Sequence, residues 1–375
     1  VLPVAMAMAY NGSRRWIRWL ATAYLFGSVT IMPALMGRTG WIAAAVGCLI
    51  VALGQGRLQR LSPWLMWLCI VGIAMAFGVA IWLKPASALG RLLIWRNGME
   101  AVAGSGLTGV GWECVGGALG DAQERFFAAN PESVFISVAG SPNYAFNEYL
   151  QIGIAFGWPA MVGFLVLLAG GILLAWRSRC YGISGSLSAF AIVAFASYPF
   201  QFREPIFLLS ALLVATVASV VRLKLRSRVV LSLLIIGISI PAATAIDYCR
   251  PLAQTSFSRG KLLRESGDFE ASTAELKRGM AYSSDPMFLN LIGRNYADVG
   301  SFNEADLWFH RSINRLPGRL YPHYLLCKLY STEQPVDTAR LREALKIALS
   351  LQPKVNSPAI EEMRSELTAL ADSIR

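Results

Sequence analysis

The sequence predicts an all-α protein: a polytopic bundle of membrane helices with a large loop on its outer face, followed by a C-terminal α-solenoid. Of its 375 residues, 55% are hydrophobic and only 15% are charged, whereas about a quarter of the residues of a soluble domain are charged. The long apolar runs stop near Tyr248, and the chain beyond it has the pattern of soluble helices. We therefore expect a membrane domain over residues 1–250 and a helical domain over residues 251–375.

About seven apolar runs approach the length of about 20 residues that a membrane-spanning helix needs. The second and fifth runs are short, and the fifth and sixth could form one broken pair around residues 201–204. Residues 1–10 are already apolar, so we expect the chain to be a fragment or a processed form with earlier spans missing. The predicted spans are residues 16–36, 41–54, 61–83, 152–176, 187–200, 205–221 and 229–246.

The placement of lysine and arginine orients these spans, because cytoplasmic connections are enriched in positive charge. With seven spans, four basic clusters fall on one side, and the other side holds Arg38, the loop of residues 84–148 and Arg203. We expect a multi-pass protein of a bacterial inner membrane, with the loop and the C-terminal domain periplasmic or extracellular. The basic clusters are residues 14–18, 57–60, 177–179 and 222–228.

The loop of residues 84–148 is the only extended polar segment in the first two-thirds of the chain. An unpaired backbone group in hydrocarbon costs several kcal/mol, so this loop must fold on one face of the membrane. A membrane enzyme would hold its site there. Within the loop, Gly109 and Gly111 are expected to permit a tight turn.

The C-terminal domain carries features that recur every 33 residues. Segment 266–270 returns as 299–303, and a third, looser unit covers residues 322–353. This pattern resembles the tetratricopeptide repeat, in which small residues let two helices pack. Such stacks often offer a concave binding surface, so the domain either binds a protein partner or serves as a cap or spacer. The recurring pairs are Gly260 and Gly293, Gly267 and Gly300, and Phe269 and Phe302.

The histidines and cysteines of the sequence restrict the kinds of catalysis and metal binding that we expect. The two histidines, His310 and His323, both fall in the C-terminal domain, which removes Ser–His catalysis and histidine-bound metal from the membrane domain. The six cysteines are scattered without zinc spacing, and no P-loop or dinucleotide fingerprint is present. We expect no metal, no cofactor and no nucleic-acid partner. Transporter and channel functions lack their usual signatures here.

Arginines recur on the predicted outer face. Arg38 lies in a short turn between two spans, Arg91 and Arg96 flank Trp95 at the loop start, and Arg203 lies in another outer turn. Arginine at a membrane surface is most often an anchor whose head group reaches for water. Its planar fork is also suited to a phosphate, so the four together predict a diphosphate site.

Glu148 follows Asn147 where the loop re-enters the membrane. A carboxylate there could accept a proton from an attacking hydroxyl if partial burial raises its pKa. The alternative is an acid that stabilises the positive end of a helix dipole. Glu113 and Asp121 are weaker candidates for the same chemistry.

The order of four motifs resembles the O-antigen ligase and polymerase superfamily, over roughly residues 16–222. Members of that family are polytopic enzymes that transfer glycans from a polyprenyl-diphosphate carrier to an acceptor on the outer face, and members with a periplasmic repeat tail are familiar. The motifs are Gly-Arg-Thr-Gly-Trp at 37–41, Gly-Arg with Trp at 90–95, Gly-x-Gly at 109–111, and Phe-Asn-Glu-Tyr-Leu-Gln at 146–151 followed by Gly157.

The resemblance implies a role for each matching residue. The family's outer-turn arginine falls on Arg38, and its loop-start arginine falls on Arg91. The family's His-Asn pair falls on the region from Tyr144 to Asn147, which has no histidine. The expected function is thus transfer of a glycan from a polyprenyl-diphosphate donor to a glycan, lipid or protein acceptor at the bilayer. Glu148 or Tyr144 would then take the acceptor proton, and Asn147 would orient a sugar or phosphate. The alternative is a non-catalytic membrane-anchored scaffold in surface-polysaccharide assembly.

Overall fold

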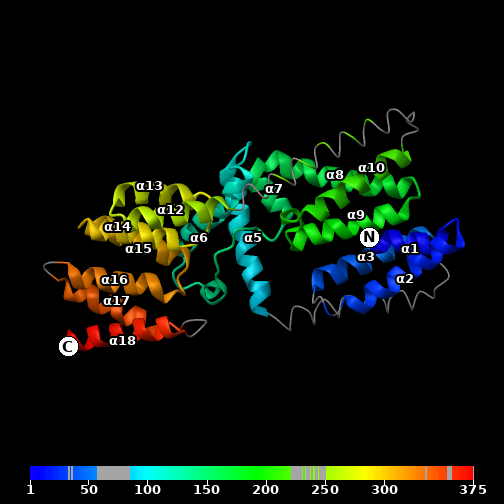
Figure 1. Ribbon diagram of the computed structural model, residues 1–375. Coiled ribbons are helices and arrows are strands. Elements are labelled where there is room, and N and C mark those ends of the chain that lie inside the picture. Colours follow the sequence, from blue (N-terminus) through cyan, green and yellow to red (C-terminus); the bar gives the residue numbers. More distant parts are fainter. Residues whose placement is uncertain are drawn as a thin grey trace. The chain divides into compact units, whose positions relative to one another are not determined.

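A computed structural model of the chain is all-α (Figure 1). It describes residues 1–32, 34, 37–56, 85–220, 251–333, 336–352 and 357–374, with single positions at 230, 233, 237, 240 and 244. Within these residues there are 16 α-helices, three short 3-10 helices and no strand. Contacts divide the chain into two compact units. The first contains residues 1–88, 146–153 and 157–248, and the second contains residues 89–145, 154–156 and 249–375.

The first unit is a bundle of apolar helices. Its helices are α1 (Leu2–Asn11), α2 (Arg15–Ile31), α3 (Arg38–Gly54), the first part of α7 (Glu148–Phe156), α8 (Trp158–Arg177), α9 (Tyr181–Ala196) and α10 (Arg203–Val220). A Cβ on Gly47 would lie 2.6 Å from the carbonyl oxygen of Gly185, so glycine there lets α3 and α9 pack backbone to backbone. Leu187 and Phe190 on α9 belong to a core shared with α8 and α10.

α1 is a helix that lies outside the predicted spans. The apolar residues 2–11 form a short helix that packs against α3 and α9. Pro3 Cγ lies 2.6 Å from the Cβ position of Gly47, and Ala7 Cβ lies 2.8 Å from that of Gly182. Gly47, which lets α9 pack against α3, therefore also leaves room for α1, and Gly182 leaves room for α1 on α9.

Where the structure describes the predicted spans, most of their residues are helical. α2, α3, α8, α9 and α10 each cover most of one predicted span. Among the described residues, only α8 is both long and apolar enough to cross a membrane, while α3 and α9 are apolar but shorter. Gly157, with a φ of 86°, ends α7 and starts α8, which shortens the span predicted from residue 152. The spans predicted at 61–83 and 229–246 lie outside the described residues, apart from single positions, and the number seven stays a prediction.

The predicted polar loop is folded rather than irregular. It forms α5 (Pro85–Ser105), the 3-10 helix η2 (Trp112–Cys114), α6 (Val115–Ala129) and the 3-10 helix η3 (Val134–Val138). A small apolar core holds these elements together through Leu93, Phe126, Phe127 and Ala139. Residues 89–145 of the loop belong to the same compact unit as the C-terminal helices.

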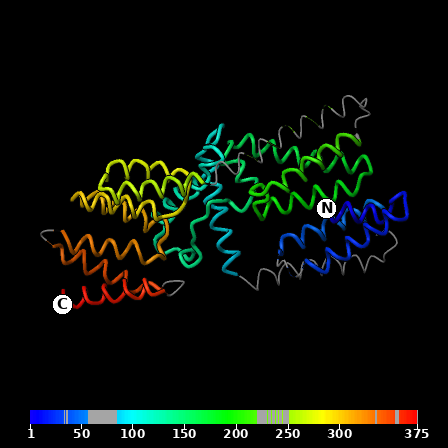
Figure 2. Tube along the Cα trace, viewed as in Figure 1, coloured from blue at the N-terminus to red at the C-terminus, as the bar shows by residue number. Residues whose placement is uncertain are grey.

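The C-terminal part is a series of helices in which each packs against the next (Figure 2). They are α12 (Leu252–Glu265), α13 (Phe269–Met280), α14 (Met287–Asp298), α15 (Phe302–Arg315), α16 (Leu320–Thr332), α17 (Thr338–Ser350) and α18 (Pro358–Ser373). The recurring glycines act as the sequence pattern indicates. A Cβ on Gly260 would lie 2.7 Å from Leu276 Cγ, and one on Gly293 would lie 2.5 Å from Phe309 Cε1. Gly267 and Gly300 follow two of the helices with φ values of 85° and 82°.

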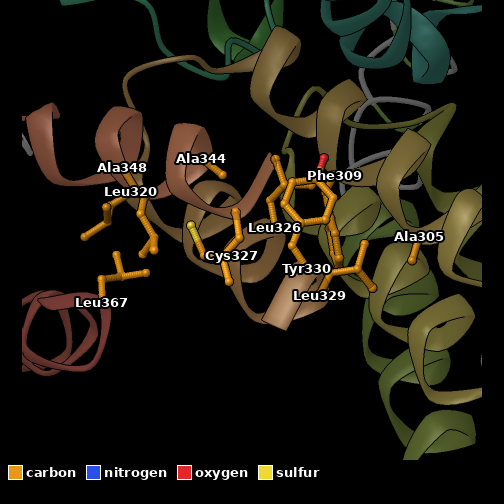
Figure 3. Close-up of a cluster of buried hydrophobic side chains, with 12 residues drawn as sticks. Ala305, Phe309, Leu320, Leu326, Cys327, Leu329, Tyr330, Ala344, Ala348 and Leu367 are labelled. Atoms are coloured by element: carbon orange, nitrogen blue, oxygen red, sulfur yellow. The ribbon is translucent and has the colours of Figure 1, made fainter. Parts of the chain in front are cut away.

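One continuous apolar cluster ties α15 to α18 (Figure 3). Phe309, Cys327, Tyr330, Leu345 and Leu367 contribute to it from four consecutive helices, and each is at most 5% exposed. These contacts give the C-terminal part a core of its own. Its assignment as a tetratricopeptide-like solenoid stays a prediction.

Candidate functional site

The direction in which the helices of the first unit pair shows at which end of the bundle each predicted site residue lies. α3 and α9 are antiparallel, because Gly54 lies beside Tyr181 and Gly47 lies beside Gly185. Arg38 is the first residue of α3. It therefore lies at the end of the pair where α9 finishes.

Three more predicted residues lie at this same end. The 3-10 helix η4 (Pro199–Gln201) follows α9, and the N–H of its Phe200 donates to Glu148 Oε1 at 2.7 Å. Asn147 precedes Glu148 at the start of α7, and Arg203 opens α10 directly after η4. Arg38, Asn147, Glu148 and Arg203 thus share one end of the bundle.

Basic residues mark the opposite end. Arg177 is the last residue of α8. Arg179 lines a surface pocket together with Asn11, the last residue of α1, and Gln55, which directly follows α3. Arg18, at the start of α2, lies close to the end of α1: its Cγ is 3.0 Å from the Cβ position of the neighbouring glycine at 12. This separation agrees with the charge pattern read from the sequence, and the compartment that each end faces stays a prediction.

Asn147 caps α7. Its Oδ1 accepts hydrogen bonds from the N–H groups of Tyr149 at 3.0 Å and Leu150 at 3.2 Å. Two of the helix's four unpaired N–H groups are thereby satisfied. Asn147 is only 5% exposed, and its capping bonds fix where α7 begins.

Glu148 is fully buried at 0% exposure. Its Oε1 accepts from Phe200, while its Oε2 has no hydrogen-bond partner among the described residues. Burial raises the pKa of this carboxyl from 4.5 to about 8, although the Phe200 N–H opposes the rise. A pKa in this range is that of a group that can exchange a proton near neutral pH.

Arg38 and Arg203 differ in exposure. Arg38 is half-buried, and no side-chain hydrogen bond caps the start of its helix. The N-terminus of a helix and a guanidinium both attract anions, and the binding of a phosphate at this position stays a prediction. Arg203 is exposed beside Glu204 at the start of α10.

Arg91, Arg96 and Tyr144 belong to the second unit. Arg91 is half-buried on α5, and Tyr144 is half-buried in the segment between η3 and α7. Arg96 is exposed, with its guanidinium carbon 3.9 Å from the centroid of the Phe126 ring. Such a cation–π contact holds the head group by its face and leaves its N–H edges available for hydrogen bonds.

The predicted turn at Gly109 and Gly111 is present, and it closes on α7. The N–H of Val110 donates to Ile154 at 3.0 Å, and the N–H of Gly111 donates to Ala155 at 3.0 Å. Gly109 has a φ of 76°, and a Cβ there would lie 2.2 Å from the carbonyl oxygen of Ala155. The motif therefore binds the end of α7 by its backbone.

A charged cluster that the sequence pattern did not indicate joins α6 to α15. Arg315 is fully buried, and its Nη2 donates to Asp121 and, at 2.9 Å, to Glu124 Oε2. Arg311 Nε donates to Glu124 Oε1 at 2.6 Å. Asp121, a weaker candidate for chemistry by sequence, is thus paired with an arginine. The glycines at 116, 117 and 120 were the available signal, because small residues at helical spacing permit close packing.

The geometry defines a helical bundle with arginines and a buried carboxyl gathered at one end. Residues 23–165 are similar to a protein family whose model is described as O-Antigen ligase. This similarity implies glycan transfer in surface-polysaccharide synthesis by a family that is typically membrane-bound. Among curated proteins, none matches the chain. The match ends before the C-terminal helices.

Proposed function

We propose that the protein is a membrane glycosyltransferase that moves a glycan from a polyprenyl-diphosphate carrier to an acceptor hydroxyl on the outer face. The observation that supports this most is the presence of Arg38, Glu148 and Arg203 at one end of the bundle. Arg38 and Glu148 lie within the region similar to O-antigen ligases, and Arg203 lies beyond it. In this proposal that end faces the periplasm or the exterior.

The reaction needs a leaving group and a proton acceptor. The acceptor oxygen bonds to the anomeric carbon of the donor glycan, and the bond from that carbon to the diphosphate oxygen breaks with its electron pair. Arg38 and Arg91, assisted by Arg96 and Arg203, bind the diphosphate and stabilise the negative charge that it gains. No redox step and no nucleotide is required.

Glu148 is our candidate for the acceptor of the hydroxyl proton. Its Oε2 has no hydrogen-bond partner among the described residues, and burial gives it a pKa of about 8. The substrate must then reach an oxygen that is buried in this structure, which requires α7 or η4 to move. Tyr144 is the second candidate, because it stands four residues before Glu148 in the same segment.

Lysine substitution of the arginines tests this proposal. Arg38→Lys and Arg91→Lys keep the charge but lose the two-pronged fork that matches a phosphate. We expect each to lower the rate of glycan transfer by at least about ten-fold, the loss that 1.4 kcal/mol of transition-state stabilisation represents. Arg177→Lys, at the opposite end of the bundle, is the matched control and should transfer at the parental rate.

Each outcome decides between the alternatives. Parental transfer by both lysine variants, at matched expression, would mean that the arginines only anchor the chain at the membrane surface. A parent that transfers nothing from a purified lipid-linked donor would favour the non-catalytic scaffold. In that case the C-terminal helices would be the part that binds a partner.

A further inference from the structure

The C-terminal helices hold the polar loop through a close and extensive contact. α6 of the loop packs along α15 and along the connection between α13 and α14. A Cβ on Gly117 would lie 2.2 Å from the carbonyl oxygen of Ala281, and one on Gly120 would lie 2.9 Å from Ser284 Cα. Only glycine fits at such distances, so this face of α6 is shaped for the C-terminal helices.

Arg315 lies at the centre of this contact. Its side chain is 1% exposed, and it donates to Asp121 and Glu124 of α6. Removing one partner of a buried ion pair leaves an uncompensated charge in the interior, which is strongly destabilising. The ion pairs of Arg315 therefore add to the close glycine packing that holds α6 against α15.

The same contact extends to the end of the loop. Gln123 Nε2 donates both to the carbonyl of Arg315 and to the carbonyl of Gly140, each at 2.7 Å. Three residues later, Asn143 Oδ1 accepts from the N–H of Ser284 at 3.1 Å, and from the hydroxyls of Ser283 and Ser284 at 3.3 Å each. The chain from 140 to 143 is thus tied to the C-terminal part directly at Asn143, and at Gly140 through Gln123 of α6.

We propose that the C-terminal helices position the end of the loop for glycan transfer, with Arg315 and Asn143 as the positioning residues. Asn143 stands immediately before Tyr144, and the motif that contains Glu148 follows within five residues. The C-terminal part is then a component of the transferase and not a separable tail that recruits partners. This inference rests on the proposed function.

The test compares two buried arginines in the full chain, reconstituted in lipid nanodiscs. Arg315→Met breaks the contact with α6. Arg264→Met is the matched control, because Arg264 is mostly buried and its partners, Asn295 and Asp298, both lie on α14. Both variants should lower the stability of the C-terminal helices, but only Arg315→Met should disturb the loop.

Two readouts separate positioning from stability. Amide hydrogen exchange over residues 139–145 should accelerate in Arg315→Met and stay parental in Arg264→Met. The turnover number for transfer should fall by about 10²-fold in Arg315→Met, the loss that a misplacement of about 1 Å carries. It should change little in Arg264→Met. Equal effects of the two substitutions on exchange and on transfer would overturn the proposal.

Asn143 provides a second test that does not alter the buried cluster. Asn143→Asp keeps the accepting oxygen and should retain parental exchange and transfer, whereas Asn143→Leu should accelerate exchange and slow transfer. Loss of protection without loss of transfer would refute the positioning role. If the parent itself transfers no glycan, the proposed function fails. Independently of transfer, parental hydrogen exchange in both Arg315→Met and Asn143→Leu would show that these residues do not position the end of the loop.

Discussion

The buried carboxyl of Glu148 should make the stability of the protein depend on pH. Its folded-state pKa of about 8 lies above the value of 4.5 for the exposed group, so the native state holds this proton more tightly than the unfolded chain. Its contribution to stability is therefore complete below about pH 4.5 and is lost as the pH rises to about 8. At 1.36 kcal/mol per pKa unit, the full loss is about 5 kcal/mol.

Glu148→Gln should remove this pH-dependent loss of stability while it keeps the hydrogen bond with Phe200. The glutamine keeps a carbonyl oxygen for the Phe200 N–H, which Glu148 Oε1 accepts at 2.7 Å, and it cannot ionise. We expect the parent and the variant to unfold at similar temperatures near pH 4.5. Near pH 9 the variant should be more stable by several kcal/mol, which corresponds to about 10 °C in Tm at about 2 °C per kcal/mol.

Thermal unfolding in nanodiscs at the two pH values measures this difference. Glu204→Gln, which alters an exposed acid at the start of α10, is the control and should show no such divergence. Identical unfolding of parent and Glu148→Gln at both pH values would mean that the carboxyl is not buried in the native state. A parent that gains stability in alkali relative to the variant would mean that Glu148 is paired with a cation.

The remaining predictions concern backbone fit and orientation. Gly106→Ala and Gly109→Ala both place alanine at positive φ, but only at Gly109 does the new Cβ meet backbone atoms. Gly109→Ala should therefore lower the stability measured by thermal unfolding by about 1–3 kcal/mol more than Gly106→Ala does. Equal losses of stability would show that the turn does not pack against α7. Gly293→Ala brings a Cβ to 2.5 Å from Phe309. It should lower the free energy of unfolding of the C-terminal helices by about 1–3 kcal/mol, and an unchanged Tm would contradict that packing. With native cysteines removed, cysteine at the exposed Ala129 should react with an impermeant reagent from outside the cell and cysteine at Arg177 should not, and the reverse pattern would overturn the orientation.

Local features of the chain were readable from the sequence. Apolar runs predicted where α2, α3, α8, α9 and α10 lie, and the turn at Gly109 followed from residue type alone. The recurrence of Gly260 at Gly293 predicted which positions admit a neighbouring helix, because a local pattern of small residues records a local contact.

Contacts between distant segments were not readable. The bond between Glu148 and Phe200 joins residues 52 positions apart, and that between Arg315 and Asp121 spans 194 positions. Neither contact produces a periodic pattern in the sequence. The sequence could therefore suggest that Glu148 is buried, but it could not identify Phe200 as its partner. The docking of the loop on the C-terminal helices, and the role of α1 in the bundle, required the folded structure for the same reason.

The most direct test of the account is a transfer assay with purified components. The parent chain in nanodiscs would be supplied with a polyprenyl-diphosphate-linked glycan and a glycan or lipid acceptor, and both products would be quantified. We predict that glycosylated acceptor and free polyprenyl diphosphate form in equal amounts, with transfer slowed in Arg38→Lys and unaffected in Arg177→Lys. Release of polyprenyl diphosphate without acceptor product, or no reaction with any acceptor, would contradict the assignment as a glycosyltransferase.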